Sequence, residues 1–384
     1  MNKIKTKRKK LQKLCTLNWE GKDTCLDCLD EPLQYEFVPC PEESVNFDTT
    51  ENLFFECDNL DALKYLQNTH SQKVKCIYID PPYNTGKSRQ YKDDFGDITG
   101  CKHSDWLNIM KPRLVLGREL LSEDGVIFIS IDHNEQAQLK MLCDEVFGEE
   151  NFQREIIWRI GWVSGYKTKV KSFVRNHDVI FIYSKNNINF KFQKKYIENK
   201  DFRPLIKDKP ELRLKLNELG LNRNQQKEMF DFINYKNRSE RYPVEDTWNC
   251  NEYDDLNSIN IVSFSGEKIS KLLNIDKDFE GQKSIKMIKR ILDSSNEEEN
   301  INLDFFAGTG TTAHSTMQLN GEDGGKRKFI LCQTPDPIDG EYSTIADLCK
   351  ERMRRAGKKV LEEAKYKDID VGFQVWKVRK KEIA

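Results

Sequence analysis

The stretch Tyr-Ile-Asp-Pro-Pro-Tyr, residues 78–83, places an acid, two prolines and an aromatic ring directly after an apolar run. Such a set suits a substrate whose exocyclic amino nitrogen must attack an electrophile. The Asp80 carboxylate and the Pro81 carbonyl would each accept an N–H hydrogen bond, and Asp80 would stabilise the positive charge that develops on the nitrogen. Pro81 and Pro82 lack N–H groups and restrict the backbone, while Tyr83 offers a flat face to an unstacked base. A simple turn that stops the strand is the alternative, but such a turn does not need Tyr83.

A second stretch, Leu-Asp-Phe-Phe-Ala-Gly-Thr-Gly-Thr-Thr at residues 303–312, joins an apolar run to a pattern of helical spacing. Glycines at a strand-to-helix turn let the backbone approach a ligand, and the helix N-terminus attracts a carboxylate. The stretch is not a nucleoside triphosphate loop, because Thr311 rather than Lys follows Gly310. It also departs from the dinucleotide fingerprint, since Ala313 stands in place of the third glycine. An ordinary strand-to-helix turn therefore remains the alternative.

Strands and helices alternate along most of the chain and would position these two stretches. Apolar runs rich in β-forming residues predict buried strands, and helical spacing of apolar residues occurs between them. The alternation predicts an α/β fold, a doubly wound parallel sheet covered by helices on both faces. One helix is expected at 105–125, ending at Gly125, with Pro112 as a kink or a second start. The expected strands lie within residues 51–67, 74–80, 125–132, 177–185, 300–310 and 328–333.

Composition limits the class of protein. The chain has 384 residues, 38% of them hydrophobic, which is enough for one large domain or two smaller ones. Its formal net charge of -1 gives no sign of a nucleic-acid binder, so any basic surface must be local. No apolar run is long enough for a membrane span, and no apolar segment follows the basic N-terminus as in a secretory signal. The odd number of cysteines, 11, fits reduced thiols, and we expect a cytoplasmic protein.

Two of these cysteines, Cys25 and Cys28, have the C-x-x-C spacing of many zinc sites. A site could be drawn with Cys15 and Cys40, but no second close pair follows. The histidines of the chain are scattered and form no metal-binding pattern. We therefore expect small, partly buried side chains here and no metal.

The character of the chain changes between residues 185 and 250. This stretch holds 15 Lys or Arg against 10 Asp or Glu, with aromatic and Asn side chains interleaved. It contains no long apolar strand, so we expect an inserted module with a polar, basic face. Such a face suits contacts with phosphates and bases, although a solvated accessory domain would have a similar composition.

The order of the two motifs resembles a known family. Asp-Pro-Pro-Tyr after one buried strand, and Phe-x-Gly-x-Gly at 306–310 after another, are similar to the amino-group DNA methyltransferases that use S-adenosylmethionine. The first motif precedes the second by about 220 residues, as in the circularly permuted β class of that family. The modification (Mod) subunit of type III restriction-modification systems is the most similar member. The stretches RLVLGRELLSEDGVIFISIDHNE, VFGEENF, TIADLCKERMRRAG and DVGFQVWKV also carry the resemblance.

The resemblance implies a role for each motif. The Asp-Pro-Pro-Tyr residues would be catalytic, Asp58 would lie beside the cofactor adenine, Lys283 near its methionine end and Gln333 near its ribose. Two positions depart from the family pattern, since Cys57 stands where Gly is usual and Ser284 where Pro is usual. The implied residues for the cofactor S-adenosylmethionine are Asp58, Asp80, Lys283, Asp304, Phe305, Phe306, Ala307, Gly308, Thr309, Gly310, Thr311, Thr312 and Gln333. A loop after the catalytic motif is expected to touch DNA through Lys87, Arg89, Tyr91 and Lys92.

From these parts we expect a DNA adenine methyltransferase that acts on the N6 amino group of a flipped base in double-stranded DNA. The resemblance implies a restriction-modification setting, a restriction (Res) subunit as a candidate partner, and a homodimer. The expected division is an N-terminal extension (1–45), a catalytic half (46–185), a target-recognition module (186–275) and a cofactor-binding half with the C-terminal tail (276–384).

Other functions stay open at this point. N4-cytosine methylation is the nearest, although the family then usually has Ser in place of Asp80. Transfer to RNA or to a protein amide is a second, and a DNA-binding subunit with vestigial methylation is a third. A nucleotide-dependent dehydrogenase is disfavoured, because the Asp-Pro-Pro-Tyr motif fits no hydride transfer.

Overall fold

The fold was obtained as a computed structural model of the whole chain. It describes residues 16–86, 93–159, 169–199, 204–236, 239–249, 269–276, 282–295 and 298–381. Within these ranges, no helix combines the length and the apolar character needed to cross a membrane.

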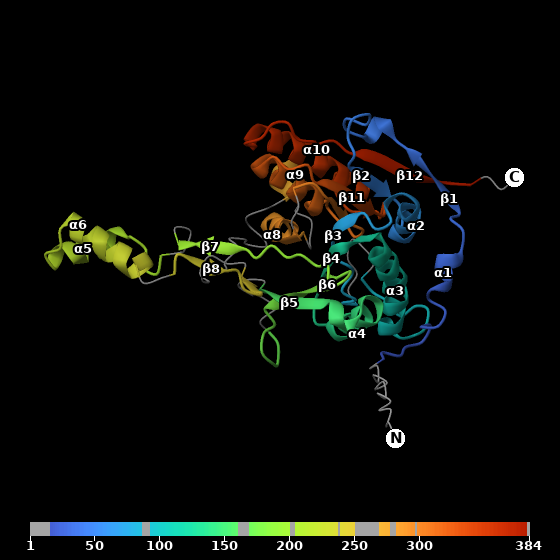
Figure 1. Ribbon diagram of the computed structural model, residues 1–384, viewed down its shortest axis with the longest axis horizontal. Coiled ribbons are helices and arrows are strands. Elements are labelled where there is room, and N and C mark those ends of the chain that lie inside the picture. Colours follow the sequence, from blue (N-terminus) through green and yellow to red (C-terminus); the bar gives the residue numbers. More distant parts are fainter. Residues whose placement is uncertain are drawn as a thin grey trace, which may run out of the picture.

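A sheet of ten described strands forms the centre of the molecule, in the order β1-β12-β2-β11-β10-β3-β4-β6-β5-β9 (Figure 1). The six neighbouring strands from β12 to β4 are parallel, whereas β1 and β6 run antiparallel to their neighbours. The strands are β1 (Tyr35–Pro39), β2 (Leu53–Glu56), β3 (Val74–Ile79), β4 (Leu121–Ile131), β5 (Phe152–Arg159), β6 (His177–Ser184), β9 (Thr247–Asn249), β10 (Ile301–Asp304), β11 (Lys328–Gln333) and β12 (Gln374–Lys380).

Helices cover both faces of this sheet. On one face, α2 (Asn59–His70), α3 (Lys102–Leu120) and α4 (Gln136–Phe147) pack on side chains such as Ile77 and Ile129. On the other face, α8 (Ile285–Ser295) packs on Tyr78 and Phe128, while α9 (Thr311–Asp323) and α10 (Ile345–Glu363) pack on Phe54 and Phe329. Alternate residues of each buried strand thus serve opposite layers, as they must in a doubly wound sheet. The short helix α1 (Asp27–Asp30) precedes β1.

The sequence prediction of a doubly wound α/β fold is confirmed, with two corrections. The sheet is not parallel throughout, because β6 pairs antiparallel with both β4 and β5. The helix expected at 105–125 ends at Leu120, and β4 begins at once, since Leu121 pairs with Val74 of β3. Pro112 does not start a second helix, because α3 continues through it with its apolar face buried.

Part of the stretch between β6 and α8 projects from the body of the molecule as an arm (Figure 1). A two-stranded ladder of β7 (Tyr196–Glu198) and β8 (Arg241–Pro243) forms its base, and α5 (Pro210–Glu218) and α6 (Arg223–Asp231) lie at its far end. The chain returns through β9, which pairs with β5 at the sheet edge, and α7 (Ile269–Leu273), which packs near α10. Of the described elements of this stretch, β9 therefore contacts the main sheet and α7 contacts the helix α10.

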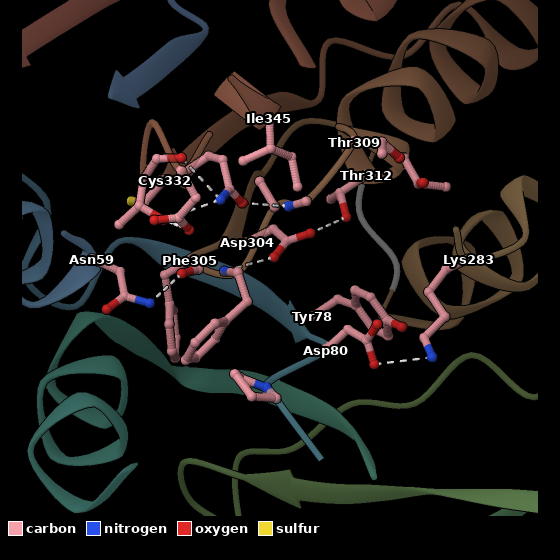
Figure 2. A pocket seen from close by; sticks show the side chains of 18 of the residues that line it. Asn59, Tyr78, Asp80, Lys283, Asp304, Phe305, Thr309, Thr312, Cys332 and Ile345 are labelled. Carbon is pink, nitrogen blue, oxygen red and sulfur yellow. Dashed lines mark hydrogen bonds and ion pairs between the residues drawn. The ribbon is translucent and has the colours of Figure 1, made fainter. Parts of the chain in front are cut away.

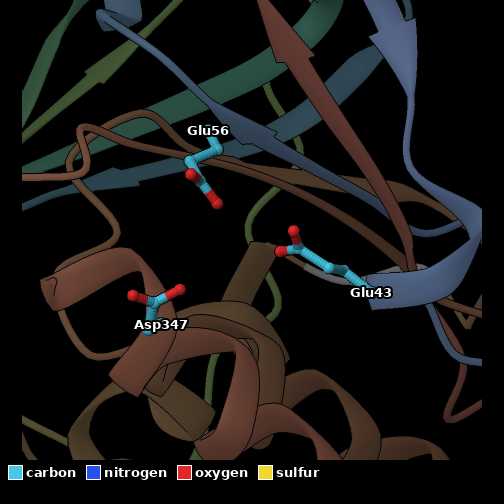
Figure 3. Close-up of side chains that lie close together, drawn as sticks. All are labelled: Glu43, Glu56 and Asp347. Atoms are coloured by element: carbon cyan, nitrogen blue, oxygen red, sulfur yellow. The ribbon is translucent and has the colours of Figure 1, made fainter. Parts of the chain in front are cut away.

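Three carboxylates, those of Glu43, Glu56 and Asp347, lie close together where the N-terminal segment meets α10 (Figure 3). The buried ammonium of Lys350 pairs with all three, at 2.6 Å from Glu56 Oε2 and 3.1 Å from Asp347 Oδ1. Lys377 of β12 pairs with Glu43 and Glu56 as well. Two lysines thus balance this acidic cluster, which fastens the outer strands to α10.

Candidate functional site

The two motifs meet at the carboxyl ends of β3 and β10, which are neighbours in the sheet. From β10 the chain proceeds to β11 on one side, and from β3 it proceeds to β4 on the other, so the strand order reverses between them. Ligands bind at such switch points in open α/β sheets. A pocket of about 300 Å³ opens here, and Asp80 and Asp304 both line it (Figure 2).

Most of the expected cofactor residues line this pocket, and Gly310 is the exception. The expected residues that do so are Asp58, Asp80, Lys283, Asp304, Phe305, Phe306, Ala307, Gly308, Thr309, Thr311, Thr312 and Gln333. Of the catalytic motif, Asp80 and Pro82 line it, whereas Pro81 and Tyr83 do not. The structure therefore brings together residues that lie about 220 positions apart in the chain.

Asp80 lies directly after β3 and is the centre of a small polar network. Tyr83 Oη donates to Asp80 Oδ1 at 2.8 Å, and Lys283 Nζ lies 3.0 Å from the same oxygen. Lys283 Nζ also donates to Tyr83 Oη at 2.7 Å and lies 4.9 Å from the centre of the Tyr83 ring. Both contacts on the carboxylate use Oδ1, so neither occupies Oδ2. Figure 2 shows Lys283 beside Asp80, with a dashed line joining the two side chains.

The charge of Asp80 depends on this network. Burial raises the pKa of the Asp80 carboxyl, and the charge of Lys283 together with the hydrogen bond from Tyr83 lowers it. The family resemblance placed Lys283 near the methionine end of the cofactor. In the structure Lys283 lines the pocket, and its ammonium is a direct partner of Asp80 and Tyr83.

Backbone contacts hold the rest of the Asp-Pro-Pro-Tyr motif. Trp106 of α3 is fully buried and donates its indole N–H to the Pro82 carbonyl at 2.7 Å. Pro81 is buried, which suits a residue without an N–H group to satisfy. The loop after the motif was expected to touch DNA, but Lys87, Arg89, Tyr91 and Lys92 lie outside the described residues.

The Gly-rich turn after β10 is held by side chains from several elements. Asp304 accepts from Phe306 N at 3.1 Å and from Thr312 Oγ1 at 2.6 Å, which fixes the turn to the start of α9. Burial raises the pKa of Asp304 to about 7. Gln333 at the end of β11 accepts from Gly308 N at 2.7 Å. Gln333 therefore braces the loop through its carbonyl oxygen.

A buried arginine below this turn was not identified from the sequence. Arg352 of α10 is 1% exposed and donates to Thr309 Oγ1 at 2.6 Å and to Thr311 Oγ1 at 2.8 Å. Its place in the basic stretch 351–359 was the available signal. From the sequence, Arg354 and Arg355 of this stretch are candidates for contacts with phosphates or with acids within the fold, and in the structure both pair with Glu351 of the same helix.

A second unexpected pair lies beside Asp58. Asp58 caps α2 by accepting from Leu60 N at 2.7 Å, and Arg113 Nη2 donates to Asp58 Oδ1 at 2.8 Å. Asn59 donates to the Phe305 carbonyl at 2.6 Å, so the start of α2 is fastened to the turn after β10. Arg113 and Asn59 both line the pocket. The position of Asn59 directly after Asp58 was the sequence signal for Asn59. No comparable signal indicated Arg113.

Known proteins that are similar to this chain match a region that contains both motifs. A family model described as DNA methylase matches residues 74–336. The Mod subunit of the type III restriction-modification enzyme EcoP15I from Escherichia coli is 30% identical over 440 residues, which cover 88% of this chain and 66% of that subunit. The type II methyltransferase M.KpnI from Klebsiella pneumoniae is 28% identical over 395 residues, 84% of this chain and 92% of its own length.

Solved structures give a more distant likeness. The PvuII DNA methyltransferase (cytosine-N4-specific) is 14% identical, with a TM-score of 0.46 over 82% of this chain and 94% of that one. The chain spans 66%, 60% and 63% of the lengths of the three type III Mod subunits to which it is similar.

The two glycines of the turn after β10 allow a matched test of the cofactor loop. Both have positive φ, 52° at Gly308 and 78° at Gly310, so alanine costs about 1 kcal/mol of backbone strain at either position. A Cβ at Gly310 would lie 2.8 Å from Cys349 Sγ, whereas at Gly308 the nearest contact is a carbonyl oxygen at 4.0 Å. Gly310→Ala should therefore weaken the binding of S-adenosylmethionine more than the strain alone.

Calorimetric titration with S-adenosylmethionine measures how much affinity Gly310→Ala loses beyond the effect of backbone strain. Adding Cys349→Ala to Gly310→Ala should recover the part of the loss that comes from the clash, because it removes the sulfur. If the double variant binds no better than Gly310→Ala alone, the close contact with Cys349 does not shape the loop.

Proposed function

The chain belongs to the DNA methylase family, and from this premise we propose that it transfers a methyl group from S-adenosylmethionine to the N6 amino group of adenine in double-stranded DNA. The observation that carries the proposal is the opening of Asp80 and the Gly-rich turn into one pocket at the switch point of the sheet. The target base would leave the helix to reach Asp80, since its amino group is inaccessible within a duplex.

The pocket suits the cofactor. Gly308 lines it, and a Cβ at that position would meet no atom closer than 4.0 Å, so the glycine leaves open space beside the turn. The first amides of α9 lie next to it and favour a carboxylate such as that of a methionine moiety. S-adenosylmethionine would supply an electrophilic methyl group on a sulfonium, and it leaves as a neutral thioether once that methyl is transferred.

Asp80 would act on the attacking nitrogen. The lone pair of an exocyclic amino group is delocalised into the ring, which makes it a weak nucleophile. Asp80 would accept one N–H hydrogen bond, turn the lone pair toward the methyl group and stabilise the cationic nitrogen as the new N–C bond forms. The cationic nitrogen then loses one proton to solvent water, so the product is a neutral methylamino group.

Analysis of DNA nucleosides tests the reaction and the base together. Unmethylated genomic DNA incubated with the protein and S-adenosylmethionine should yield N6-methyladenine on mass spectrometry. Asp80→Ala should lower the rate by about 10² or more, the range of a lost acid-base contact, while cofactor affinity stays close to normal. N4-methylcytosine as the product would keep the mechanism and replace the base, and loss of cofactor binding in the variant would mean that the site is misplaced.

Lys283 would keep Asp80 ionised for this step. Its ammonium lies 3.0 Å from the carboxylate and opposes the rise in pKa that burial causes. In Lys283→Met the pKa of Asp80 should rise. The Asp80 carboxylate, the active form, would then become protonated at a higher pH than in the unaltered protein. The acidic limb of the pH–rate profile should accordingly move to higher pH at saturating cofactor, whereas Lys283→Arg should keep the limb near its original position. An unmoved limb in the Met variant contradicts this role.

Residues 186–275 would form the target-recognition module, between the catalytic half at 46–185 and the cofactor-binding half at 276–384. Support comes from the projecting arm of α5 and α6 and from the excess of Lys and Arg over Asp and Glu in residues 185–250. Basic and amide side chains on such an arm suit contacts with phosphates and base edges. The arm stands apart from the pocket, which lets it vary while the chemistry stays the same.

An exchange of this module for that of another family member tests the assignment. The graft should retain β9, residues 247–249, because these residues pair with β5 and close the sheet edge. Sequencing of the methylated DNA should show a new target sequence with the same methylated base. An unchanged target would mean that recognition lies elsewhere in the chain.

The setting proposed is a restriction-modification system. The relatives named Mod subunits belong to type III restriction-modification enzymes, and this likeness supports a Res subunit as a partner that cleaves DNA. A homodimer is proposed with it, because one pocket modifies one strand at a time. DNA as the substrate makes the cytoplasm the expected location. Size measurement of the purified chain, alone and with DNA, decides the number of copies.

A further inference from the structure

A buried carboxylate behind the catalytic loop has no part in the chemistry described so far. Glu135, in the turn before α4, is 0% exposed, although its charge would favour water. Its Oε1 accepts from Asn84 Nδ2 at 2.5 Å, and His103 Nδ1 lies 2.7 Å from the same oxygen. Asn84 directly follows Tyr83, so Glu135 contacts the loop that carries Asp80.

Asn84 has a conformation that needs support. Its φ is 58°, in the left-handed region, and its side chain is fully buried. Asn84 N donates to Asp93 Oδ1 at 2.9 Å, and Asn84 Nδ2 donates to the Lys102 carbonyl at 3.0 Å. The reversal of the chain after Tyr83 is thereby tied to the start of α3 and to the turn before α4.

The arrangement carries an energetic cost. Asn84 Oδ1 and Glu135 Oε2 are buried without a hydrogen-bond partner among the described residues. Burial raises the pKa of Glu135. The hydrogen bond from Asn84 and the charges of His103 and Lys102 oppose this rise. Buried polar groups with few protein partners are uncommon in native proteins, which distinguishes this contact from the rest of the core.

We propose that Glu135 is a positioning residue that clamps Asn84 and thereby fixes the orientation of Asp80 and Tyr83 in the pocket. This inference rests on the proposed methyl transfer, because its consequence is the alignment of the attacking nitrogen. Glu135 does not line the pocket. It acts through the backbone that joins Asn84 to Tyr83, where a displacement of about 1 Å costs on the order of 100-fold in rate.

Two variants remove the clamp from opposite sides. Glu135→Ala removes the carboxylate, and Asn84→Gly removes the amide while keeping a residue that adopts positive φ without strain. Each should lower kcat by about 100-fold with little change in the KM for S-adenosylmethionine. The double variant should be little worse than either single variant, because both remove the same contact. Glu135→Gln, which keeps an acceptor oxygen, should recover most of the loss.

Glu145→Ala is the matched control. Glu145 lies on α4 as well and pairs with Lys22 at 2.6 Å and with Lys111 at 3.2 Å, away from the catalytic loop. Its loss should leave kcat unchanged. Amide hydrogen exchange provides a second measurement. The Asn84 and Gly86 amides donate to Asp93. Both amides should exchange faster in Glu135→Ala than in Glu145→Ala.

The outcomes separate the clamp from the reaction. An unchanged kcat in Glu135→Ala and Asn84→Gly, an equal loss in Glu145→Ala, or additive losses in the double variant would each overturn the clamp. If the unaltered protein methylates no DNA, the proposed function fails, and the exchange rates of Asn84 and Gly86 then decide whether the clamp exists.

Discussion

The proposed reaction depends on keeping one carboxylate charged at the buried edge of a sheet. In that reaction Asp80 would accept a hydrogen bond from a weak nucleophile and stabilise a developing cation, and its neutral form would do neither well. Burial favours the neutral form. The opposing interaction comes from Lys283, far along the chain, and from Tyr83, only three residues away. The placement of the ammonium therefore constrains how the segment before α8 returns to the pocket.

The sheet explains how such distant residues meet. β3 and β10 are adjacent and parallel, so their carboxyl ends lie at the same edge although the projecting stretch separates them in the chain. The chain leaves the sheet after β6, forms the arm, and returns through β9 to α8 and Lys283. Both strands that flank the pocket belong to the parallel core and not to the arm. Variation in the arm can therefore leave the pocket geometry intact.

Sequence patterns predicted the buried strands and the two motifs, but they did not predict the buried side chains that hold the loops in place. The apolar runs of β3 and β10 mark buried strands, and the motifs that follow them have a composition that few turns require. The antiparallel pairing of β6 was missed because no strand was predicted from the sequence at β5, which pairs antiparallel with β6. Arg352, Arg113 and Glu135 were missed for a different reason: their partners lie far away in sequence, and only the packing of helices on the sheet brings them together.

These buried supports share one physical logic. The Gly-rich turn and the loop after Asp80 each contain residues with positive φ, which local sequence alone holds weakly. Each is braced from behind by a buried ionisable side chain, Arg352 in one case and Glu135 in the other. Hydrogen bonds in such a low-dielectric setting are strong when satisfied and costly when broken, so they restrict each loop to a narrow set of positions. A site that aligns two small reacting groups gains more from that restriction than from additional contacts with either ligand.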